Sequence, residues 1–127
     1  GTPFAIAGSV AGWRETLDML RGLGVETVVP GHGPVCGPES FDAVDDYLAW
    51  IQEIAADGFA KGTPPLELAT ALDLGRFSEL TDPERLVPNL HRAYSELRGE
   101  ERGVPLDGSV FGEMLTYNGG GPLRCLA

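Results

Sequence analysis

The sequence predicts an α/β fold that is mostly helical, with one or two short strands. The mostly apolar run at residues 25–29, rich in β-branched residues, is bounded by turn residues, which is typical of a buried strand. Four or five other segments repeat apolar residues at helical spacing. Because a buried apolar strand needs neighbours on both edges and layers on both faces, we expect this chain to be the back half of a larger α/β domain.

The first segments set up that strand. Residues 2–7 form a weak candidate for an edge strand, where a proline near the start is tolerated. Ser9 can then cap a helix, and Gly24 is placed to end it. The apolar positions that predict this helix are Val10, Trp13, Leu17, Leu20 and Leu23.

A second, longer helix is predicted after Gly37 and Pro38, because proline is favoured in a first helical turn. Gly58 and Gly62 are expected to loosen the chain after it, and the segment Thr63-Pro64-Pro65 opens a short helix that runs to Gly75. The apolar face of the long helix consists of Phe41, Val44, Leu48, Ile51 and Ile54.

The last third of the chain predicts two more helices. Thr81 and Glu84 have the spacing of a capping box, and an apolar stripe continues from there to Gly99. Pro88 lies inside this stripe and is expected to kink or split the helix. Residues 107–115 show a final, short helical pattern.

The segment Thr27–Pro34 carries the clearest candidate functional residue. His32 lies between Gly31 and Gly33, just beyond the carboxyl end of the predicted strand, where α/β sheets keep their chemistry. Glycines on both sides let the backbone approach a bound group closely, and a neutral imidazole is a common zinc ligand. The alternative is a turn histidine that bonds to a nearby carbonyl.

The order helix, apolar strand, Pro-Gly-His-Gly-Pro and long helix resembles the C-terminal half of a metallo-β-lactamase superfamily hydrolase. The segments Gly1–Phe4, Gly8–Ser9 and Tyr117–Gly120 also resemble parts of one subgroup. The resemblance implies the C-terminal half of an αββα sandwich, with a metallo-hydrolase core part at 1–62 and a helical extension at 63–127. It also implies that His32 is a ligand of the second metal in a two-zinc site.

The chain departs from that family because it lacks the His-x-His-x-Asp-His cluster and contains only two histidines. One histidine cannot fill a zinc site that needs three or four protein ligands, so we expect no hydrolase activity from this chain alone, and we assign no catalytic residue. A missing N-terminal half, or another chain completing the sheet, would supply the other ligands. The complete protein would act on a small-molecule substrate.

Composition limits the partners. The 127 residues include 19 acidic and 9 basic side chains, a formal net charge of −10, which argues against nucleic acid and anionic membranes. There is no apolar run of membrane-spanning length and no signal-peptide pattern at the start, so we expect a cytoplasmic protein.

The remaining candidates have simpler structural explanations. Cys36 is conceivable as a thiolate ligand beside His32, but a small buried thiol fits better. His91 is expected to be exposed or bonded to a helix cap. Four aromatic residues are candidates for a pocket lining, although core packing suits them better: Trp50, Phe59, Phe77 and Tyr94.

Two other hypotheses stay open. One is a non-enzymatic, acidic and mainly helical protein-interaction module, in which His32 is a turn residue. The other is a degenerate family member that keeps the fold without catalysis.

Overall fold

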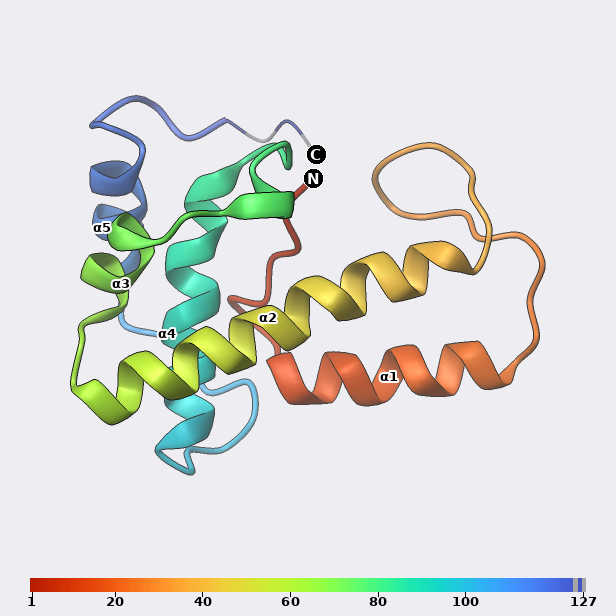
Figure 1. Ribbon diagram of the computed structural model, residues 1–127, viewed down its shortest axis with the longest axis horizontal. Coiled ribbons are helices and arrows are strands. Elements are labelled where there is room, and N and C mark those ends of the chain that lie inside the picture. Colours follow the sequence, from red (N-terminus) through yellow and green to blue (C-terminus); the bar gives the residue numbers. More distant parts are fainter. Residues whose placement is uncertain (125, 127) are drawn as a thin grey trace.

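A computed structural model describes residues 1–124 and 126 of the chain. In this part of the chain the regular structure is helical (Figure 1). The helices are α1 (Val10–Gly22), α2 (Glu39–Lys61), α3 (Pro65–Ala71), α4 (Leu86–Leu97) and α5 (Ser109–Tyr117), with short 3-10 turns η1 (Gly75–Phe77) and η2 (Pro83–Arg85). None of these helices is both long and apolar enough to cross a lipid bilayer.

The predicted α/β sandwich is wrong for this chain. Among the described residues no β-strand forms, and the run at 25–29 contributes only one isolated antiparallel bridge, between Val28 and Cys36. Residues 2–7 also form no strand. A β-branched run becomes a strand only when neighbouring strands satisfy its backbone, and this chain folds without them.

The residues that the sequence predicts at the two ends of α1 lie at those ends in the structure. Ser9 is the N-cap, with its Oγ accepting a hydrogen bond from the Gly12 N–H at 2.9 Å. Gly24 follows the helix with a φ of +65°, in the left-handed region that favours glycine. Val10 and Leu17 are buried, as the apolar spacing predicts.

Helix α2 continues further than predicted, because Gly58 lies inside it and Gly62, at φ +70°, ends it. Gly58 does not loosen the chain. A Cβ at that position would lie 2.5 Å from both Leu68 Cδ2 and Tyr94 Oη, so the missing side chain allows α3 and α4 to approach closely.

Helix α4 packs against α2, α3 and α5 and, together with α2, supplies most of the buried core cluster. The predicted capping box does not form, and Asp82 instead takes a left-handed φ of 56° before η2. Pro88 produces no kink because α4 begins at Leu86, so the proline occupies the first turn, where no N–H is needed. The buried apolar residues of this helix are Leu86, Val87, Leu90, Ala93 and Tyr94.

Two buried polar side chains of α4 hold the N-terminal segment. Asn89 bonds the Ala5 N–H and the Pro3 carbonyl, each at 2.8 Å, and the Tyr47 hydroxyl at 3.2 Å. The Arg92 guanidinium donates to the carbonyls of Ile6, at 2.6 Å, and Val104, at 2.8 Å. Residues 1–9 are therefore anchored on α4 and do not form a sheet edge.

Candidate functional site

The loop that joins α1 to α2 carries His32. It projects from one end of the molecule, beyond the last turn of α1 and the first turn of α2, and away from α3, α4 and α5 (Figure 1). Its base is closed by the bridge, in which Val28 N–H donates to Cys36 O at 2.8 Å and Cys36 N–H donates to Val28 O at 3.0 Å.

His32 lies at the exposed tip of this loop. Gly33 has a φ of +98°, so the turn requires glycine there. Gly31 does not adopt a positive φ, so only Gly33 uses a backbone conformation that favours glycine. The imidazole is accessible and lies outside the apolar core.

A shallow depression of about 440 Å³ lies between this loop, the N-terminal segment and the helical pair. His32 lines it, together with Phe4, Trp13 and Val44. Arg85 holds the part of the lining formed by the N-terminal segment. Its guanidinium lies 5.2 Å from the centre of the Phe4 ring and donates a hydrogen bond to the Thr2 carbonyl at 3.0 Å. The depression is mostly apolar, with the imidazole at its edge.

Large apolar side chains are exposed around the same end of the molecule. Exposed fractions reach 71% for Met19, 70% for Leu23, 77% for Val29 and 64% for Val35. Leu20, on the last turns of α1, is also exposed. We call these five residues the loop-end apolar surface: Met19, Leu20, Leu23, Val29 and Val35.

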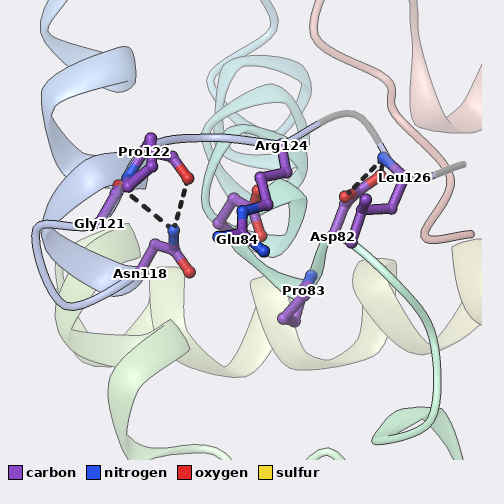
Figure 2. A pocket seen from close by; sticks show the side chains of 8 residues that line it. All are labelled: Asp82, Pro83, Glu84, Asn118, Gly121, Pro122, Arg124 and Leu126. Carbon is purple, nitrogen blue, oxygen red and sulfur yellow. Dashed lines mark hydrogen bonds between the residues drawn. The ribbon is translucent and has the colours of Figure 1, made fainter.

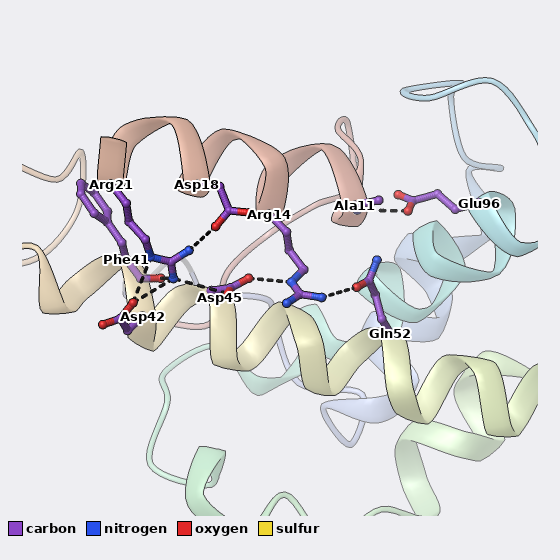
Figure 3. Close-up of polar contacts among 9 residues, drawn as sticks. All are labelled: Ala11, Arg14, Asp18, Arg21, Phe41, Asp42, Asp45, Gln52 and Glu96. Carbon is purple, nitrogen blue, oxygen red and sulfur yellow. Dashed lines mark hydrogen bonds and ion pairs between the residues drawn. The ribbon is translucent and has the colours of Figure 1, made fainter. Parts of the chain in front are cut away.

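Helix α1 is held to α2 beneath this surface by a polar network (Figure 3). Arg14 Nε donates to Asp45 at 2.6 Å, and Arg14 Nη1 donates to Gln52 at 2.8 Å. Arg21 pairs with Asp18 at 2.6 Å and with Asp42 at 2.9 Å. The hydrogen bond from Arg14 lowers the pKa of the Asp45 carboxyl, so this carboxylate stays charged in mildly acidic solution.

The described residues do not form a metal site by themselves. Within residues 1–124 and 126 no three or more His, Cys, Asp or Glu side chains come together in a group that could hold a metal. Cys36 is half-buried and its Sγ lies 3.7 Å from the Val28 carbonyl oxygen. With these residues alone the chain does not fit a zinc site, and its description as a zinc hydrolase with a metallo-β-lactamase fold is wrong.

The other histidine is placed elsewhere. His91, on α4, is half-buried, and its Nε2 lies 2.7 Å from Glu113 Oε2 of α5. The expectation of an exposed or cap-bonded histidine is therefore wrong. The pair joins two helices on the side of the molecule remote from the loop (Figure 1).

The four aromatic candidates pack among themselves and with the core. Trp50 and Phe77 lie 4.9 Å apart between ring centroids, and Phe59 and Tyr94 lie 5.3 Å apart at a steep angle. The Tyr94 hydroxyl donates to the Thr63 carbonyl at 2.8 Å. Their geometry is that of interhelical packing.

A second depression, of about 300 Å³, lies under the C-terminal segment (Figure 2). No sequence pattern indicated it, because the residues around Asp82 resembled a helix cap. The Asp82 carboxylate accepts from the Leu126 N–H at 3.1 Å, and Asn118 Nδ2 donates to the carbonyls of Gly121 and Pro122. These polar groups fasten the C-terminal segment to η2 and α5, so we treat this depression as structural.

Comparisons with protein-family models, with curated proteins and with solved structures each found no match to this chain. The resemblance to the metallo-β-lactamase superfamily therefore has no support from a known relative. The loop and its apolar surroundings are left as the candidate site on geometry alone.

Proposed function

We propose that this chain is a helical protein-interaction module that binds another polypeptide at the loop-end apolar surface. The observation that supports this is the exposure of Met19, Leu23, Val29 and Val35 at one end of the molecule. Covering such side chains contributes about 1.5–3 kcal/mol each. Gathered exposed apolar residues of this kind typically mark a contact surface.

The adjoining depression extends the same surface. Phe4, Trp13 and Val44 give it apolar walls, and His32 adds a polar group at its edge. A few polar groups in an apolar setting fix the register of a partner, while the apolar area supplies most of the affinity. Under this proposal His32 is a contact residue.

The charge of the chain bears on the partner. A net charge of −10 repels acidic surfaces and accelerates encounters with basic ones. We also propose that the module works in the cytoplasm, since the Cys36 thiol is free and reducing compartments keep thiols in that state.

Site-specific photocrosslinking tests this proposal. A photoreactive amino acid placed at Val35 should capture a partner, and the same amino acid at Phe111, which is 52% exposed on α5, should not. The captured partner is then purified and titrated. We expect the variant Leu23→Ser with Val29→Ser to bind it at least about tenfold more weakly, with Phe111→Ser unchanged.

An equal affinity of the double variant and the original chain would refute the proposal. So would capture at Phe111 alone, because the contact surface would then lie on α5. Circular dichroism of each variant shows whether the helices are intact, so a loss of binding is not mistaken for a loss of fold.

A second candidate follows from the accessible position of His32 on its loop. We propose that His32 supplies one ligand to a zinc site whose other ligands come from another polypeptide, in a complete protein that acts on a small molecule. What supports this is the Pro-Gly-His-Gly-Pro motif and the solvent-facing imidazole. Zinc would act there as a Lewis acid.

Elemental analysis tests this second candidate. Zinc per chain is measured for this chain alone and for a version extended at its amino end, each with His32 or with His32→Ala. The candidate requires more zinc in the extended form and a lower content after the substitution. Unchanged zinc in the extended His32→Ala protein would eliminate it, with His91→Ala as the matched control.

A further inference from the structure

In residues 25–29 the backbone N–H and C=O groups on one side of the segment are hydrogen-bonded, and those on the other side are not. Val28 exchanges both of its hydrogen bonds with Cys36. In extended chain, successive residues direct their N–H and C=O groups to opposite sides, so Thr27 and Val29 point theirs away from Cys36. In the part of the chain that the structure describes, these groups of Thr27 and Val29 bond to no other residue.

The opposite side of the bridge offers no comparable edge. On that side the outward-facing residues are Val35 and Gly37, and the Gly37 N–H already donates to Glu39 Oε1 at 2.9 Å. An incoming strand would therefore find its successive donors on the side of Thr27 and Val29 and not on the side of Val35.

The side chains of the open segment suit strand pairing. Val29 is 77% exposed and Thr27 is exposed, whereas Val28 packs against the core cluster. β-branched residues are the types that favour a pleated, half-buried surface. Proteins usually protect such an edge with lysine or proline, and none of residues 27–29 is of either type.

The charge around this edge selects a basic partner. Glu26 lies on the segment itself, and Glu39 follows on the first turn of α2. With a net charge of −10 for the chain, two copies would repel each other. A strand that carries lysine or arginine at its ends meets complementary charge instead.

We propose that residues 25–29 receive an extended, basic polypeptide strand, which pairs with the backbone groups of Thr27 and Val29. The partner adds a strand beside the Val28–Cys36 bridge, the mode known as β-augmentation. This inference rests on the proposed function and specifies how the partner binds. It assigns recognition to the backbone of Thr27 and Val29, with Val29 as the apolar contact.

Three synthetic peptides test the proposal on the full chain. The first has the sequence Lys-Thr-Val-Thr-Val-Thr-Lys, the second carries N-methyl groups on its three central residues, which blocks both edges of the strand, and the third replaces both lysines by glutamate. Binding is followed by two-dimensional amide NMR, and protection by hydrogen exchange. We expect the first peptide to slow exchange at Thr27 and Val29 by about tenfold or more at saturation.

The second and third peptides separate backbone pairing from apolar contact. N-methylation should weaken binding by roughly tenfold, because it removes backbone donors. Exchanging both lysines for glutamate should weaken peptide binding. The weakening should be larger at low salt, where the repulsion between like charges is less screened.

Two variants of the chain complete the test. Val29→Pro removes an N–H that has no partner among the described residues, so the helices should be intact while peptide binding is lost. Phe111→Ser, on helix α5 and outside the loop-end apolar surface, is the control and should bind as the original chain does.

The outcomes distinguish this inference from the proposed function. Equal binding of the methylated peptide, or unchanged exchange at Thr27 and Val29 with peptide bound, refutes strand addition. The loop-end apolar surface would still stand as a contact surface if the Leu23→Ser, Val29→Ser variant lost its captured partner. If the peptide tests fail and the Leu23→Ser, Val29→Ser variant still binds its partner as the original chain does, both proposals are refuted.

Discussion

Glu96, on α4, accepts a hydrogen bond at 2.5 Å from the backbone N–H of Val10, the first residue of α1. Its second carboxylate oxygen accepts from the Ala11 N–H at 3.1 Å (Figure 3). A carboxylate from elsewhere in the chain thus satisfies two of the donors that a helix start leaves unpaired, and it lies at the positive end of the helix dipole.

Replacement of this carboxylate should therefore detach α1. We expect Glu96→Ala to lower the free energy of unfolding by about 1–2 kcal/mol, as measured by urea denaturation. Glu101→Gln, at an exposed position beyond α4, is the control and should be near neutral. An equal effect of the two substitutions would show that the contact contributes nothing.

Two helical glycines should respond in opposite ways to alanine. Gly58→Ala places a Cβ 2.5 Å from Leu68 and Tyr94, so we expect it to destabilise the protein by about 1–3 kcal/mol. Gly112, inside α5, has open space where a methyl group would lie, with nothing within 4 Å, and Gly112→Ala should stabilise by about 0.5–1 kcal/mol. Thermal unfolding of both variants measures the difference, and a gain in stability for Gly58→Ala would contradict the close packing.

The buried amide of Asn89 should be costly to remove. Asn89→Ala leaves the Ala5 N–H and the Pro3 carbonyl without their partner, and we expect a loss of about 2–4 kcal/mol in unfolding free energy. Tyr47→Phe removes only the 3.2 Å contact to the same amide and should cost about 0.5–1.5 kcal/mol. Hydrogen exchange at Ala5 should accelerate in the first variant, and an unchanged rate there would argue against the anchoring role.

Acid should weaken the contact between α1 and α2. The pKa of Asp45 is lowered in the folded state, chiefly by the hydrogen bond from Arg14. The stabilisation is therefore present above the unfolded pKa and is lost as the pH falls through the folded pKa. Asp45→Asn should flatten the acid limb of a stability profile measured between about pH 2 and pH 6. Asp46→Asn, on the exposed pair with Arg76, is the control.

The sequence predicted the helices best where the signal was local. Ser9, Gly24 and the spacing from Val10 to Leu17 act within a few residues, and the structure follows them. The strand at 25–29 was predicted wrongly because its apolar pattern depends on neighbours that this chain does not supply.

Tertiary contacts decided the remaining differences. Gly58 could not be interpreted without Leu68 and Tyr94 on other helices, and Pro88 could not be placed without the true start of α4. For the candidate site, the motif placed His32 on a loop. The exposed side chains around it became evident only once the helices were packed.

The two carbonyls held by Arg92 have a mechanical consequence. Ile6 precedes the first helix and Val104 follows the fourth, yet a single guanidinium joins both to α4. Fraying of either stretch leaves this buried cation with one acceptor fewer, so we expect the leading residues and the turn near 104 to open together. Amides in these distant stretches should exchange with a common opening free energy.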